Sequence, residues 1–139
     1  MDKATPKDVF EANRERAAPL LQQLRADGIG HLIDGKIEPS SSGDSFETRS
    51  PIDGAVLATV ARGNAEDIDR AATAAAKAFK SWRDMPAPMR KKLLHRVADA
   101  IEDRADDIAV LECIDTGQAH RFMAKAAVRA AENFRFFAD

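Results

Sequence analysis

The feature that most constrains the fold is the helical periodicity of the second half of the chain. From residue 64 to residue 139, apolar side chains recur every three or four positions, which places them on one face of an α-helix. Breaks at 85–88 and near Gly117 divide this run. We therefore predict helices near 65–81, 88–103, 105–115 and 119–137. The apolar faces that are rich in alanine allow close backbone approach, so these helices should pack on one another or on a sheet.

The first of these helices has a clear start signal. Asn64 can cap its amino end, and Glu66 and Asp67 in the first turn interact favourably with the helix dipole. We expect the acidic pairs of the helical region to lie on polar faces, where water or local ion pairs satisfy them. The apolar stripe of this helix comprises Ile68, Ala72, Ala75, Phe79 and Trp82.

Residues 1–30 are predicted to form a helical N-terminal lead-in. Thr5 can cap the helix, and Asp8 follows three residues later, the spacing of a capping box. Pro19 falls inside the segment and lacks a backbone donor, so we expect it to break or kink the helix.

Residues 31–62 predict two short β-hairpins. Asp34 and Gly35 readily adopt the positive φ angles of a two-residue turn, and Leu-Ile at 32–33 and Lys-Ile at 36–37 flank them. A second turn, Pro-Ile-Asp-Gly at 51–54, separates two further segments of strand character. Apolar residues on both faces of 55–60 predict a strand that is covered on both sides. On residues alone, the fold class is mostly α with two short N-terminal β-hairpins.

Charge and composition exclude several classes of function. The net charge is −2, which attracts neither nucleic acid nor an anionic membrane, so we expect neither as a partner. No apolar stretch reaches the roughly 20 residues that span a bilayer, and the first residues lack the pattern of a signal peptide. A single cysteine fits a reducing compartment. These features predict a cytoplasmic protein.

Cys113 is the first candidate nucleophile. A catalytic cysteine needs a base, a cation or a helix N-terminus to lower its pKa. Cys113 instead falls late in a predicted helix and follows Glu112, and both features disfavour the thiolate. We interpret it as a small, half-buried helix residue.

The tripeptide Asp-Thr-Gly at 115–117 also occurs in aspartic proteases, where two copies share a proton. Here one copy follows a predicted helix, so we interpret Gly117 as the left-handed residue beyond the helix end.

The chain's histidines share no metal-ligand spacing and are expected at the surface or in turns. No glycine-rich phosphate loop is present. The residues alone therefore predict no catalytic and no cofactor-binding site. The histidines are His31, His95 and His120.

From residue 32 onward, the chain resembles the N-terminal region of the aldehyde dehydrogenase superfamily. Each match is short, but their order and spacing over roughly three-quarters of the chain are specific because independent matches multiply. The main matching segments are Leu-Ile-Asp-Gly-Lys at 32–36, Phe-Glu-Thr-Arg-Ser-Pro at 46–51, Gly-Ala-Val-Leu-Ala-Thr-Val-Ala at 54–61, Glu-Asp-Ile-Asp-Arg-Ala at 66–71, Asp-Thr-Gly at 115–117 and Phe-Arg-Phe-Phe-Ala at 134–138.

The resemblance implies an α/β enzyme with a Rossmann-type cofactor domain, of which residues 31–139 are an incomplete N-terminal part. It implies NAD or NADP as the cofactor of the full-length enzyme, an aldehyde as its substrate, and a homo-oligomer when complete. In this family a cysteine thiolate attacks the aldehyde, hydride passes to the nicotinamide, and a glutamate activates water. These residues come later in the family's sequences. We therefore carry no catalytic or cofactor-binding role onto this chain, and expect it to bind no cofactor alone.

Two further expectations come from the resemblance. The lead-in helix, together with Gln118 where most members have lysine, resembles the 5-carboxymethyl-2-hydroxymuconate semialdehyde dehydrogenases of aromatic-acid degradation. Some family members hold a monovalent cation with the backbone at the position of Thr48 and the carboxylate at that of Asp115, which makes these residues a hypothetical metal site. The alternative is that Asp115 accepts hydrogen bonds from nearby backbone donors.

The leading prediction is an N-terminal fragment of an NAD(P)-dependent aldehyde dehydrogenase, which oxidises an aldehyde or semialdehyde to the acid. The fragment lacks the catalytic residues and is expected to be inactive alone. Two features of the sequence support an incomplete domain. The predicted sheet is too small to cover the apolar helix faces, and the last helix has no cap. The alternative is a short helical interaction module that binds a partner protein through the same faces. A protease is the third and weakest hypothesis.

Overall fold

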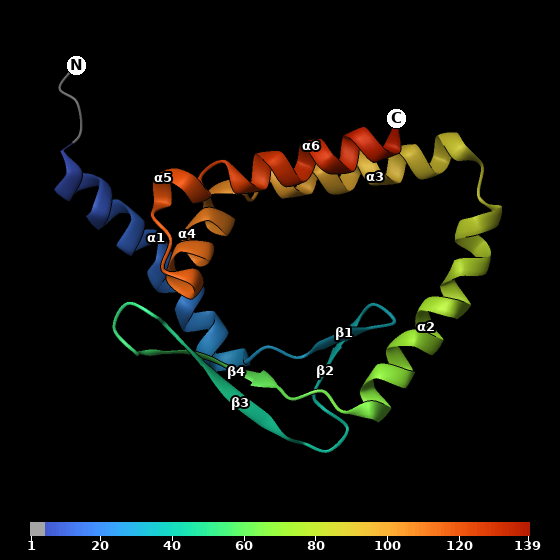
Figure 1. The fold of residues 1–139 in the computed structure, drawn as a ribbon, viewed down its shortest axis with the longest axis horizontal. Coiled ribbons are helices and arrows are strands. Elements are labelled where there is room, and N and C mark those ends of the chain that lie inside the picture. Colours follow the sequence, from blue (N-terminus) through green and yellow to red (C-terminus); the bar gives the residue numbers. More distant parts are fainter. Residues whose placement is uncertain (1–4) are drawn as a thin grey trace.

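The computed structural model describes residues 5–139 and is mostly helical, with two antiparallel strand pairs. This arrangement confirms the predicted fold class. In Figure 1 the hairpins lie at one side, α2 leads away from them, and α3 returns beside α6. The elements in chain order are α1 (Pro6–Asp27), β1 (His31–Ile33), β2 (Lys36–Glu38), β3 (Ser45–Arg49), β4 (Val56–Ala61), α2 (Ala65–Asp84), α3 (Ala87–Glu102), α4 (Ala105–Thr116), α5 (His120–Met123) and α6 (Ala126–Ala138).

Helix α1 begins at the predicted capping box. The backbone N–H of Asp8 donates to the Thr5 hydroxyl at 3.3 Å, and the N–H of Thr5 donates to the Asp8 carboxylate at 2.8 Å. The predicted break at Pro19 is wrong, because the helix runs through it to Asp27. The alternative, a kink, stays a prediction. The Pro19 ring lies on an exposed face, where water can satisfy the carbonyl that loses its bond one turn back.

The first hairpin has the predicted two-residue turn. Strands β1 and β2 pair antiparallel, with Ile33 opposite Lys36. Asp34 has φ of 50° and Gly35 has φ of 76°, so both turn residues take the left-handed conformation that such a tight connection requires. Ile33 is buried, whereas Leu32 on the opposite face is exposed.

The second hairpin pairs β3 with β4 and forms one wall of the core. Leu57 and Ala58 are neighbours in β4 and both are buried, so this strand is covered on both faces, as predicted. Ile29, which lies just before β1, is hydrogen-bonded to β4 of the second hairpin. Its N–H donates to the Thr59 carbonyl, and its carbonyl accepts from the Ala61 N–H, both at 2.8 Å. The segment between α1 and β1 is therefore held against β4.

The predicted helix over 119–137 is two helices in the structure. Helix α5 ends at Met123 and α6 begins at Ala126, with a turn between them. The local sequence contains good helix formers and no glycine or proline, so propensity gives no sign of the turn. The turn between the two helices results from tertiary packing, because α5 packs on α4 whereas α6 packs mainly along α3.

Alanine forms most of the core between the helices. Ala98 in α3 and Ala127 and Ala131 in α6 are 0–2% exposed, and among the described residues no large side chain is fully buried. The predicted close approach of alanine faces is confirmed. Helices α3 and α6 run antiparallel (Figure 1), and Arg135 on α6 pairs with Glu102 on α3 at 2.7 Å.

Many large apolar side chains remain exposed in the described structure, among them those of α2 and of the end of α6. The stripe of α2 faces outward, with Ile68 69%, Phe79 57% and Trp82 37% exposed. At the end of α6, Phe136 and Phe137 are also exposed, with their rings edge to face. Within residues 5–139, no helix is both long and apolar enough to cross a membrane.

Candidate functional site

Asp67 is a buried polar anchor that sequence reasoning missed. We predicted a solvated helix face for it, but its side chain is only 3% exposed. Its carboxylate accepts from the Ser40 hydroxyl and from the Ser41 N–H, both at 3.0 Å, and from the Asn64 N–H at 3.2 Å. Burial alone would raise the pKa of Asp67, but the hydrogen bonds from Ser41, Asn64 and Ser40 outweigh it and hold the pKa below its ordinary value.

The anchor extends into the first hairpin. Arg70 pairs with Glu38 on β2 and also lies 3.4 Å from Asp67. The His31 Nε2 atom is buried, lies 3.6 Å from the Asp67 carboxylate, and makes no hydrogen bond in the described structure. His31 is therefore a half-buried strand residue, which corrects its predicted place at the surface or in a turn. The first turn of α2 is thus fixed to β1, to β2 and to the loop at 39–43 that contains Ser40 and Ser41, which we call the serine loop.

The two residues of the hypothetical cation site lie together, although they are far apart in the sequence. Thr48 on β3 donates its hydroxyl to the Asp115 carboxylate on α4 at 3.3 Å. The hydrogen-bond partner of Asp115 is therefore a side chain from another element. A hard cation needs several oxygen ligands, and residues 5–139 contain no cluster of three or more metal-ligating side chains. Thr48 and Asp115 could supply only part of a ligand set, so the cation site stays a prediction.

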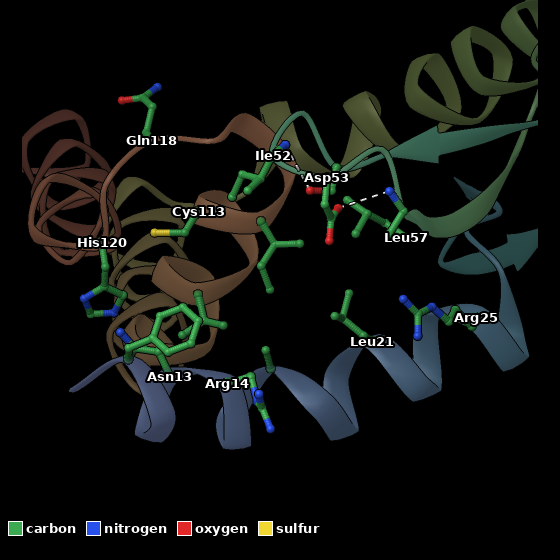
Figure 2. Close-up of a pocket in the computed structure, with 16 residues that line it drawn as sticks. Asn13, Arg14, Leu21, Arg25, Ile52, Asp53, Leu57, Cys113, Gln118 and His120 are labelled. Carbon is green, nitrogen blue, oxygen red and sulfur yellow. Dashed lines mark hydrogen bonds between the residues drawn. The ribbon is translucent and has the colours of Figure 1, made fainter. Parts of the chain in front are cut away.

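A pocket of about 400 Å³ lies between α1, the β3–β4 turn and α4. Figure 2 shows Cys113 and His120 at one end of it, and Leu57 and Arg25 at the other. Arg25 donates from Nε to the Val56 carbonyl at 3.2 Å, which fixes that end of α1 to β4. Most of the lining is apolar. Such a surface can hold an apolar group, and polar side chains such as Asn13, Asp53 and His120 also line it.

The environment of Cys113 agrees with a half-buried helix residue. Burial raises the pKa of its thiol, and the neighbouring Glu112 charge raises it further. The thiol is therefore protonated at neutral pH, and a protonated thiol is a poor nucleophile.

The tripeptide at 115–117 ends a helix, as predicted. Gly117 has φ of 73°, and its N–H donates to the Cys113 carbonyl at 3.0 Å. The Thr116 hydroxyl donates to the Glu112 carbonyl at 2.6 Å and accepts from the Gln118 N–H at 3.3 Å. In aspartic proteases a strand precedes this tripeptide, whereas here helix α4 precedes it. The tripeptide therefore lacks the structural context that the protease hypothesis requires.

The other two histidines have separate surroundings. His95 lies 2.7 Å from the carboxylate of Asp139, which Lys91 also contacts at 2.9 Å, so this group joins α3 to the end of the chain. His120 lines the pocket of Figure 2. The structure does not bring the three histidines together.

Comparisons with known proteins give a consistent result. The sequence profile of the Aldehyde dehydrogenase family matches residues 37–139. Aldehyde dehydrogenase 1 of Tanacetum cinerariifolium is 44% identical over 112 residues, which cover 77% of this chain and 22% of that protein. The 5-carboxymethyl-2-hydroxymuconate semialdehyde dehydrogenase of Escherichia coli is 37% identical over 112 residues, which cover 80% of this chain and 24% of that protein.

Solved structures extend the match to the lead-in helix. The crystal structure of HpcC from Thermus thermophilus has a TM-score of 0.86 and 41% identity, and the match covers 89% of this chain and 24% of that one. The NAD+ complex of aldehyde dehydrogenase from Bacillus cereus has a TM-score of 0.80 and 33% identity, and covers 86% of this chain and 25% of that one. The chain thus spans about a quarter of the length of these proteins. With most of its length matched by the family profile and its fold shared with these enzymes, the chain belongs to the aldehyde dehydrogenase family.

Proposed function

We propose that the chain is the N-terminal portion of the cofactor domain of an NAD(P)-dependent aldehyde dehydrogenase. The whole enzyme oxidises an aldehyde or semialdehyde to the acid, works as a homo-oligomer and is cytoplasmic. The names of the relatives support this assignment, because one is a semialdehyde dehydrogenase and another structure is a complex with NAD+. The nicotinamide of the bound cofactor would accept the hydride.

The family match over residues 37–139 carries the proposal. The chemistry of the described residues agrees with a scaffold that contributes no reacting group. The single thiol has a raised pKa, and the most buried carboxylate, Asp67, is occupied by hydrogen bonds within the fold. In this proposal the Asp67 anchor and the packing of α3 on α6 hold one wall of the cofactor domain in shape. Thr48 and Asp115 contribute part of a monovalent cation site in the complete enzyme.

The test is a segment exchange in a related enzyme. Residues 32–139 replace the matching segment of HpcC from Thermus thermophilus, whose structure is closely similar, and NADH formation from a semialdehyde is measured. We expect the chimera to oxidise the aldehyde and this chain alone to show no activity. A chimera that carries Cys113→Ser should be equally active, because Cys113 is not the nucleophile. A correctly assembled but inactive chimera would contradict the proposal.

The interaction-module hypothesis gives a different result in the same experiment. An evolved module would be soluble and would fold cooperatively, alone or with its partner, whereas a portion of a larger domain would aggregate or retain helix without fixed packing. Cooperative folding of this chain, together with an inactive chimera, would favour the module.

A further inference from the structure

The tripeptide Ile-Asp-Gly occurs in the turns of both hairpins. One copy is at 33–35, between β1 and β2, and the other is at 52–54, between β3 and β4. An aspartate followed by glycine can lose water to form a succinimide, because glycine has no side chain that hinders attack by its own nitrogen. Both aspartates are exposed, and the residues before and after them are the same. A large difference in their reactivity would therefore come from the fold.

The aspartate of the second hairpin is protected at both reacting groups. The Gly54 N–H donates to the Ser50 carbonyl at 2.9 Å, so its nitrogen is engaged. The Asp53 carboxylate accepts from the Ala55 N–H at 3.1 Å. The Ala55 N–H, and to a lesser extent the Ser50 hydroxyl, hold the pKa of Asp53 below its ordinary value. The carboxylate is therefore ionised at neutral pH, and an ionised carboxylate is a poor electrophile.

The aspartate of the first hairpin lacks both kinds of protection. Within residues 5–139, the Gly35 N–H makes no hydrogen bond and the Asp34 carboxylate accepts none. Among the same residues, Asp34 is also the one non-glycine residue with a positive φ, which is 50°. The left-handed conformation is unfavourable for an L-residue, although aspartate tolerates it better than most. The two reacting groups are therefore free, and the backbone that joins them is strained.

We propose that Asp34 is a site of spontaneous isomerisation to isoaspartate and that the fold protects Asp53 from the same reaction. The Gly35 nitrogen attacks Cγ of Asp34 and forms a C–N bond. One carboxylate oxygen leaves as water, with the proton of that nitrogen and one proton from solvent. Water then adds at the main-chain carbonyl carbon of Asp34 and breaks its bond to the Gly35 nitrogen. The main chain afterwards runs through Cβ and Cγ of Asp34, and no oxidant, reductant or cofactor is consumed.

The product has one more main-chain carbon in a turn of only two residues. This turn sets Ile33 opposite Lys36, so a longer turn disturbs the register of the two strands. Strand β2 also carries Glu38, which pairs with Arg70 on α2. Isomerisation of Asp34 should therefore loosen the attachment of the first hairpin to α2.

Ageing of the HpcC chimera at neutral pH tests the proposal. The peptides that contain residues 34 and 53 are separated by liquid chromatography and mass spectrometry, and their isoaspartate fractions are followed with time. Two hydrogen bonds of ordinary strength correspond to about fivefold to a hundredfold in rate. We expect Asp34 to isomerise at least about fivefold faster than Asp53 in the folded protein, and both to react at similar rates in urea. A smaller ratio in the folded protein, or the same ratio in urea, would overturn the proposal.

Asparagine variants provide a second measurement. The Asp34→Asn and Asp53→Asn side chains undergo the same attack and lose ammonia instead of water, so their reaction does not depend on the charge of a carboxylate. We expect the Asp34→Asn variant to deamidate faster, because the Gly54 N–H is bonded and the Gly35 N–H is not. Equal rates would contradict the proposal. Both comparisons are repeated in the 139-residue chain itself, because the protecting bonds form within residues 50–55. Neither needs dehydrogenase activity, so this proposal and the proposed function can fail separately.

Discussion

Replacing Ala98 by leucine tests whether alanine is required where α3 packs on α6. Ala98 is 0% exposed, and α6 is the principal neighbour of α3. Leucine adds three carbon atoms where the structure has no free space, and overpacking of this kind costs about 1–3 kcal/mol. Its helix propensity is close to that of alanine, so the helix itself loses little. The chain alone is expected to lack fixed packing, so the substitution is made in the HpcC chimera, where it should lower the free energy of unfolding in urea by about 2 kcal/mol.

The matched control is Ala100→Leu, two residues further along α3 and exposed. Urea unfolding of both chimeric variants is followed by far-ultraviolet circular dichroism and compared with that of the unaltered chimera. We expect a loss of about 2 kcal/mol for Ala98→Leu and less than about 0.5 kcal/mol for Ala100→Leu, because a surface substitution changes stability little. Equal effects at both positions would show that the loss does not come from the α3–α6 contact, and would refute the reasoning.

Three further predictions follow from single sites. Gly117→Ala should destabilise the HpcC chimera by about 1–2 kcal/mol in urea unfolding, because the φ of 73° at this position is unfavourable for any residue with a Cβ. The hydrogen bond from Arg135 lowers the pKa of Glu102 in the folded chain. The stability that this carboxylate adds is therefore present above its unfolded pKa of about 4.3 and is lost as pH falls through the lower folded value. Glu102→Gln should make the melting temperature fall less steeply in that pH range. Cys113 should react with iodoacetamide more slowly at neutral pH than a free thiol does, since burial and Glu112 raise its pKa, and Glu112→Gln should speed the reaction.

Local signals predicted the elements whose causes lie within a few neighbouring residues. Thr5 and Asn64 each cap a helix by a bond to a residue three positions on, and the turn at 34–35 needs only its own two residues. Gly117 ends α4 for the same kind of local reason. These interactions involve residues adjacent in the sequence, so a single sequence contains what is needed to predict them.

Features that depend on distant contacts could not be predicted in this way. Asp67 is an acidic residue in a first helical turn, and nothing nearby shows that the serine loop and the first hairpin bury it. The turn at 124–125 reflects different partners for α5 and α6, and the continuity at Pro19 reflects which side of α1 faces solvent. Thr48 and Asp115 were paired only by the family resemblance, because 67 residues separate them.

The Asp67 anchor also bears on the order in which the chain can fold during synthesis. Its bond to Ser40 closes a loop of only 27 residues, all of which have been made once the first turn of α2 is complete. The cost of closing a loop grows slowly with its length, and the amino-terminal part of a chain emerges first. The ion pair of Arg16 with Asp106 cannot form until α4 has been synthesised, and the pairing of Glu102 with Arg135 cannot form until α6 has been synthesised. Nascent chains arrested once α2 has left the ribosome should therefore already protect the serine loop from proteolysis.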